Sequence, residues 1–288
     1  MEEAGYNIAE IASLYSQLAG VLSGFAFTGL LLLLTARLSP AGSSTHETTP
    51  LVPPTRFLIV SFVGLLISSL TYAALAGDVP KSRRLASLEL VAGLGFAASG
   101  LLLFYAIALT FDSLSIASER VNFALDSVGS FIRLILATIL TPLMFFFLYL
   151  GIQDYNIATQ RKAIGALDIT AWALILLQII IGTTVYLRLS GKKSLTGKKR
   201  EKSLRMAASF ALSLIIGVGI WFASLAALLY DATMTGPLFV PYLVLFVSFL
   251  SANSFVYHLA RTRPAPNDRV NRELIEETEW PYGGRSYF

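Results

Sequence analysis

The chain has 288 residues, of which 55% are hydrophobic and only 14% are charged, and its formal net charge is +4. A soluble domain carries about 25% charged residues, so this composition excludes an ordinary soluble protein and indicates a membrane protein. Cysteine is absent, which excludes disulfides, thiolate metal sites and cysteine nucleophiles.

Seven long apolar stretches separate the charged segments, and each approaches or exceeds the ~20 residues that cross a bilayer. They are residues 17–36, 57–76, 88–110, 127–150, 169–189, 206–230 and 237–260. Continuous apolar runs predict helices, because a membrane β-barrel would show short alternating segments. We therefore expect an all-α, polytopic transmembrane helix bundle of about seven spans, forming one domain over residues 1–260. The first ten residues contain three glutamates and no basic residue, so we expect no cleavable signal peptide.

The basic residues predict the orientation of these spans. With seven spans, sixteen of the 22 basic residues fall on one side and five on the other, and Arg133 lies inside the fourth span. Because positive charge accumulates on the cytoplasmic side, we expect the N-terminus outside and the C-terminus in the cytoplasm. The membrane we expect is the plasma (inner) membrane.

Three polar segments lie outside the apolar stretches. Residues 38–55 are rich in Ser, Thr and Pro and are expected to form a flexible loop. Residues 188–205 form a basic cytoplasmic loop that we expect to rest against anionic lipid headgroups, with docking of a nucleotide or protein as the alternative. The charged tail, 261–288, could form a short helix over 268–279, which either packs on the bundle or docks a partner. Nucleic acid is not an expected partner.

The chain lacks the sequence motifs of the most familiar enzyme classes. There are two histidines, His46 and His258, and the chain contains no HExxH, Gly-x-Ser-x-Gly, P-loop or dinucleotide fingerprint. No predicted span carries an acid near its centre, and none carries a lysine there that could hold retinal as a Schiff base. We therefore expect no catalytic residue, no cofactor and no metal, and a protein that is not an enzyme.

Small residues recur in the spans and predict close helix packing. In the first span, Gly20 and Gly24 belong to a stripe of small residues spaced by four, and the third and sixth spans carry Gly93 and Gly217. Such stripes let helix backbones approach closely, either within the bundle or between protomers of a homo-oligomer.

A proline in the fourth span predicts a break in its helix. Pro142 removes one backbone N–H and clashes with the carbonyl of Thr138, and the hydroxyl of Thr138 or Thr141 could repair the break. The kink is either an ordinary packing feature or a border of a substrate or ion path.

Polar residues in the fifth and seventh spans are the other candidates for a cavity or path. Ser248, Ser251 and His258 follow one helical stripe, with Asn253 on a neighbouring one, and His258 is the side chain in the spans that titrates near neutral pH. Gln178 lies near the middle of the fifth span, where a buried amide needs a partner. These residues either join helices by hydrogen bonds or contact a ligand.

Ionisable residues near the span ends form the last group. Glu89 opens the third span and joins Asp78, Asp168 and Asp231 near the outer surface, as an acidic rim that either favours cations or is merely solvated. Arg133 is close enough to the end of its span for its charge to reach the interface; otherwise it is functional.

These patterns favour a non-enzymatic channel or transporter-like protein for a small solute or ion. Pro142, Gln178 and the polar seventh span would line its path. The alternative is a membrane sensor or scaffold that signals through the basic loop and the C-terminal tail. An enzyme of lipid chemistry is the weakest reading, because no catalytic constellation exists.

Overall fold

The computed structural model describes residues 8–38, 52–79, 82–117, 122–160, 165–192, 195, 197–231, 233–234 and 236–262. In these ranges every regular element is a helix, and seven helical segments are long and apolar enough to cross a membrane. The elements are α1 (Ile8–Leu38), α2 (Val52–Ala76), α3 (Arg83–Ala117), α4 (Asn122–Ile135), η1 (Leu136–Leu140), α5 (Thr141–Ala158), α6 (Ala166–Lys192), α7 (Gly197–Leu228) and α8 (Phe239–Arg261). The expected all-α bundle of seven spans is therefore confirmed, with α4, η1 and α5 forming one span.

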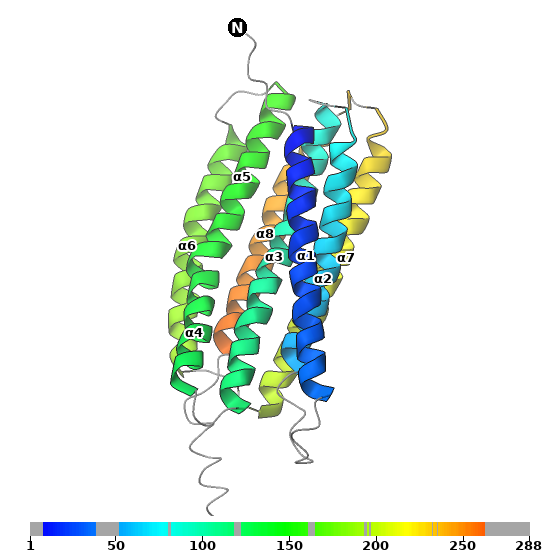
Figure 1. The fold of residues 1–288 in the computed structure, drawn as a ribbon. Coiled ribbons are helices and arrows are strands. Elements are labelled where there is room, and N and C mark those ends of the chain that lie inside the picture. Colours follow the sequence, from blue (N-terminus) through cyan, green and yellow to red (C-terminus); the bar gives the residue numbers. More distant parts are fainter. Residues whose placement is uncertain are drawn as a thin grey trace, which may run out of the picture.

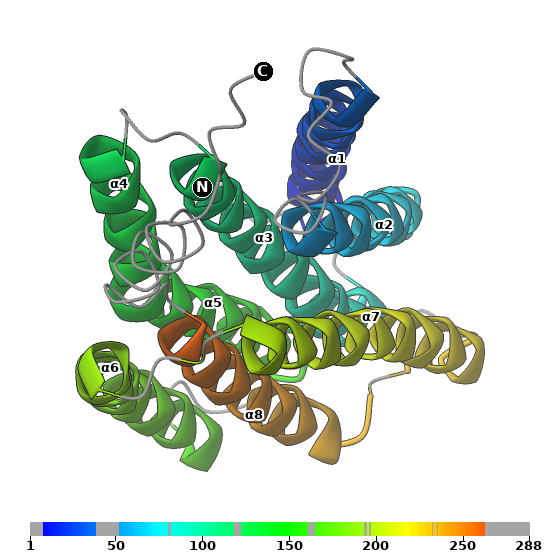
Figure 2. The ribbon, with the colours of Figure 1, turned by 90° about the horizontal axis from the view of Figure 1, so that it is seen from below.

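The helix α3 is the centre of the bundle. It contacts α1, α2, α4, α5, α7 and α8, while α6 lies outside it against α5 and α8 (Figures 1 and 2). Over its most apolar stretch α3 is 56% buried, against 22% for α1. Successive spans run in opposite directions (Figure 1). We call the end where α6 stops and α7 starts the basic end, and the other the acidic end.

Two of the segments expected to be loops are partly helical. In the segment 38–55, α1 ends at Leu38 and α2 begins at Val52, and the structure does not describe residues 39–51 between them. The basic segment 188–205 is mostly an extension of two helices, since α6 continues to Lys192 and α7 begins at Gly197. The tail beyond Thr262, including the short helix expected over 268–279, lies outside the described residues.

The contact between α1 and α2 uses a different stripe from the one predicted. Small residues of α1 pack on α2 at alternating spacings of four and three, and they are Ala12, Ser16, Ala19, Ser23 and Ala26. The Ser16 hydroxyl donates to the Ser69 carbonyl at 2.9 Å, and the Ser69 hydroxyl donates back to the Ser16 carbonyl at 3.0 Å. A stripe spaced strictly by four turns about 40° per step around a helix of 3.6 residues per turn, so it leaves the interface.

The predicted packing glycines are accordingly corrected. A Cβ added at Gly24 or Gly217 meets nothing within 4 Å, and at Gly20 and Gly93 it makes only ordinary contacts of 3.6 Å. Gly24 and Gly217 therefore make no close helix contact within the bundle, and packing between protomers through them stays a prediction.

Other glycines allow the closest approaches. A Cβ at Gly64 of α2 would lie 2.2 Å from the Ser99 hydroxyl of α3, and a Cβ at Gly182 of α6 would lie 2.9 Å from the Ala137 carbonyl of η1. The absence of a side chain at Gly64 lets α2 pack closely against α3. The absence of one at Gly182 lets α6 pack closely against the irregular turn of the fourth span.

Candidate functional site

The fourth span contains a π-helical turn, η1, immediately before Pro142. The Thr141 N–H donates to the Leu136 carbonyl, and the Thr141 hydroxyl donates to the same carbonyl at 2.6 Å. In this π register the Thr141 N–H goes to Leu136, and residue 142 has no N–H, so the Ala137 carbonyl receives a hydrogen bond from neither residue. The irregularity predicted at Pro142 is thus present, and the Thr141 hydroxyl bonds the Leu136 carbonyl rather than the Ala137 carbonyl that lacks its helical donor. The Thr138 hydroxyl bonds its own helix, donating to the Leu134 carbonyl at 2.7 Å.

A pair of amides joins α6 to α8 next to this turn. Gln178 is fully buried, and its Oε1 accepts a hydrogen bond from Asn253 Nδ2 at 3.1 Å. The other two amide atoms, Gln178 Nε2 and Asn253 Oδ1, are buried without a hydrogen-bond partner among the described residues. The pair therefore connects two helices in the apolar interior, with one donor and one acceptor unused.

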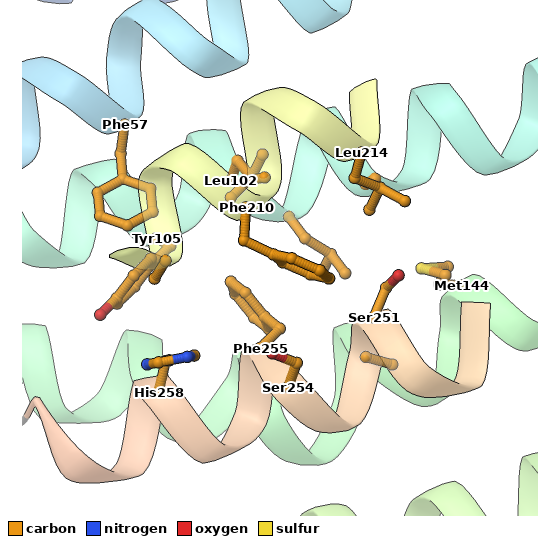
Figure 3. A pocket seen from close by; sticks show the side chains of 15 residues that line it. Phe57, Leu102, Tyr105, Met144, Phe210, Leu214, Ser251, Ser254, Phe255 and His258 are labelled. Carbon is orange, nitrogen blue, oxygen red and sulfur yellow. The ribbon is translucent and has the colours of Figure 1, made fainter. Parts of the chain in front are cut away.

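A cavity of about 60 Å³ lies elsewhere, between α7 and α8 with α3 as its floor (Figure 3). Phe210 of α7 and Phe255 of α8 point into it from opposite sides, and Met144 of α5 closes one end (Figure 3). Its lining is Phe57, Ala98, Leu101, Leu102, Tyr105, Met144, Ala207, Phe210, Ala211, Leu214, Ser251, Ala252, Ser254, Phe255 and His258.

The exposure of the lining shows where the cavity opens. Tyr105 and Phe57 in the floor are 1% exposed, whereas Phe210 on α7 is 52% exposed and Ser254 on α8 is half-buried. The gap between α7 and α8 therefore faces the lipid side of the bundle. Ser248 donates to the Val244 carbonyl at 2.6 Å, but no described residue accepts a hydrogen bond from the hydroxyls of Ser251 and Ser254.

The cavity ends at a polar, positively charged border at the basic end. His258 lines it, and Nδ1 of that ring is 3.1 Å from the Ser203 hydroxyl of α7. Arg200, one turn earlier on α7, donates from Nε to the Thr262 carbonyl at 2.8 Å. Lys199 and Lys202 are exposed on the same turn. An apolar slot thus meets cationic side chains at one end.

A buried ion pair stands beside this border. Arg133 of α4 is fully buried and pairs with Asp112 of α3, and Arg200 Nη2 lies 3.3 Å from the same carboxylate oxygen. Arg133 Nη1 also donates to the Leu259 carbonyl at 3.3 Å, and its guanidinium lies 5.9 Å from the ring centre of Tyr105. Arg133 is therefore held inside the bundle and does not reach the interface. These contacts tie α3, α4, α7 and α8 together.

Tyr105 links the ion pair to the cavity. Its ring forms part of the cavity floor, and its hydroxyl lies 2.6 Å from the Thr262 hydroxyl at the end of α8. A molecule in the cavity would therefore touch a side chain that also contacts the end of α8 and Arg133.

The predicted path is divided by the structure. Ser251 and His258 line the cavity, whereas Gln178 and Asn253 meet on the other side of α8. Side chains two positions apart on an α-helix point in directions that differ by about 200°. Asn253 and Ser251 therefore cannot share a face. Thr138, Thr141, Pro142 and Ser248 are also absent from the lining, although Met144 follows Pro142 by two residues.

The four acidic residues of the predicted rim have separate local roles. Asp78 pairs with Arg84, whose Nε donates to its Oδ2 at 2.9 Å. Asp168 accepts from the Gly165 N–H at 3.0 Å, as a residue in the first turn of a helix does. Hydrogen bonds from the Thr233 N–H and hydroxyl lower the pKa of the exposed Asp231.

Glu89, 9% exposed, differs from the other three because its buried Oε2 has no hydrogen-bond partner among the described residues. Asp168 is buried as well, at 4% exposure, whereas Asp231 is exposed, so the four carboxyls do not share one environment. Among the described residues, no cluster of three His, Asp or Glu side chains is placed to hold a metal ion.

Sequence reasoning missed Asp112, Tyr105 and Ser203. The sequence did contain a signal for Asp112. This residue follows the end of the third apolar stretch, and Arg133 lies near the start of the fourth, so the two opposite charges fall on the same side of the membrane. The comparisons give no further guide: no protein-family model, curated protein or solved structure matches the chain.

Proposed function

We propose that this membrane protein binds a single-chain, anionic amphiphile in the cavity between α7 and α8, as a non-enzymatic binding or carrier protein. The observation that carries the proposal is an apolar cavity that opens sideways to lipid and ends at cationic side chains. A short stretch of the apolar chain would lie in the cavity between Phe210 and Phe255, with the rest in the lipid-facing gap between α7 and α8. The acidic headgroup would lie near His258 and Lys199.

The chemistry of the lining supports this class of ligand. Burial of apolar surface contributes about 25 cal/mol per Å², so the aromatic and aliphatic walls favour a hydrocarbon chain. The headgroup would lie at the basic end, where anionic lipid headgroups were already expected from the segment 188–205. A path for a small solute or ion has less support, because most of its expected residues lie away from the cavity.

The proposal is tested by equilibrium binding of cis-parinaric acid, a fluorescent single-chain carboxylate, to the protein in nanodiscs. Ala211, 7% exposed, lines the cavity, and Ala211→Phe should fill it and weaken saturable binding at least tenfold. The matched control is Ile220→Phe, on the lipid face of the same helix at 62% exposure, which should bind like the wild type. Lysophosphatidylglycerol should displace the probe better than lysophosphatidylcholine. Equal binding by both variants would contradict the proposal.

A sensor that signals through its tail is the second candidate. It is favoured by the attachment of the end of α8: Thr262 bonds to Tyr105 and Arg200, and the Leu195 N–H donates to the Arg261 carbonyl at 2.8 Å. A ligand against Tyr105 would act on this attachment and on the segment that follows it. Protease protection of the tail that changes with saturating amphiphile would support sensing, and protection that does not change would count against it.

A further inference from the structure

A carboxyl group is buried near the acidic end of α3, on the face opposite the cavity. Glu89 lies in the membrane-spanning part of α3 with 9% exposure, and its Oε2 has no hydrogen-bond partner among the described residues. Nine residues further along α3, Ala98 lines the cavity, and nine residues correspond to about 180° around the helix. Glu89 therefore belongs to a separate site.

The surroundings of Glu89 are aromatic on one side and acidic on the other. Tyr15 of α1 and Tyr72 of α2 lie near it with ring centres 5.2 Å apart, and Tyr72 is 3% exposed. Phe96, two turns along α3, packs edge-on against Tyr72 at 6.1 Å. A second carboxyl, that of Asp154 on α5, is also buried, at 8% exposure. Its negative charge repels a negative charge on Glu89.

The cations on the same helix are directed elsewhere. Arg84 pairs with Asp78, lies near Asp231, and donates to the Leu229 and Tyr230 carbonyls at 3.3 Å. Arg83 is exposed to solvent. In the described part of the chain, therefore, no basic side chain forms an ion pair with Glu89.

We propose that Glu89 is a proton-binding site within the membrane, holding its proton in the folded protein and exchanging it on the side of Asp154. An ionised carboxylate buried without a counter-charge or hydrogen bonds is costly, and such a group is neutral instead. Ionisable residues inside a span mark functional sites by default. Protonation of Glu89 then sets the charge between α1, α2, α3 and α5, so the packing of these helices responds to pH.

Carbodiimide labelling tests this assignment on the wild-type protein in nanodiscs. Dicyclohexylcarbodiimide is apolar and adds to protonated carboxyl groups in apolar surroundings, whereas a water-soluble carbodiimide reaches exposed ones. Peptide mass spectrometry at pH 7 should show Glu89 modified by the apolar reagent at least tenfold more than Glu201, which is exposed on α7. The water-soluble reagent should show the reverse order, and Glu89→Gln should remove the label from the α3 peptide.

Two results would overturn the proposal. One is labelling of Glu89 by the apolar reagent that is no greater than that of Glu201. The other is protection of Glu89 by sodium ions at constant pH, which would make a metal cation the ligand. Neither result bears on amphiphile binding between α7 and α8.

Discussion

The approach of α6 to the irregular turn of the fourth span predicts a specific effect of Gly182→Ala. The new Cβ would lie 2.9 Å from the Ala137 carbonyl oxygen, where ordinary contacts begin at 3.4 Å, so α6 must move by about 0.5 Å. The obstacle is backbone, which cannot rotate away, and the shift would also disturb the Gln178 amide, 3.6 Å from the same point. Overpacking of this kind costs about 1–3 kcal/mol.

The assay is thermal unfolding in detergent, followed by tryptophan fluorescence. At roughly 2–4 °C per kcal/mol, Gly182→Ala should lower Tm by about 2–12 °C. Gly217→Ala is the control, since a Cβ there meets nothing within 4 Å, and its Tm should stay within about 1 °C of the wild type because surface changes are usually small. If the two variants had the same Tm, α6 would not approach the fourth span as described.

Further predictions concern the ion pair and the orientation of the chain. Asp112→Asn should destabilise the protein by about 3–5 kcal/mol because it leaves Arg133 buried without its partner. The double variant Asp112→Leu with Arg133→Met should recover much of that loss in the same Tm assay. An Asp112→Asn variant as stable as the wild type would refute the pairing. Reporter fusions after Asp231 and after Arg263 should report opposite sides, the second cytoplasmic, and matching signals would contradict the expected orientation.

The number and positions of the spans could be predicted because each depends on a local property, a run of apolar residues long enough for the bilayer. The break at Pro142 was predictable for the same reason, since a missing N–H is a property of one residue. The contacts between side chains of different helices could not be predicted in this way. The meeting of Gln178 with Asn253, the pairing of Asp112 with Arg133 and the burial of Glu89 all depend on how the helices are rotated about their axes.

Small residues show the same limit more clearly. A GxxxG pattern in α1 indicated a packing face, but the face that meets α2 is centred on Ala19, and Gly24 is exposed beside it. Both stripes contain small residues, and only the three-dimensional arrangement separates them. The cavity was missed for a similar reason, because its walls come from five helices and most of them are ordinary apolar residues.

The most direct test of amphiphile binding is to map where the ligand lies. A fatty acid carrying a diazirine in the middle of its chain, added to the protein in nanodiscs and activated by light, should modify the walls of the cavity at Phe210, Leu214 and Phe255. That labelling should be abolished by excess unlabelled fatty acid, while labelling of Phe25, 66% exposed on α1, should not be competed. Labelling spread evenly over both surfaces, with no competition at the cavity, would contradict the account.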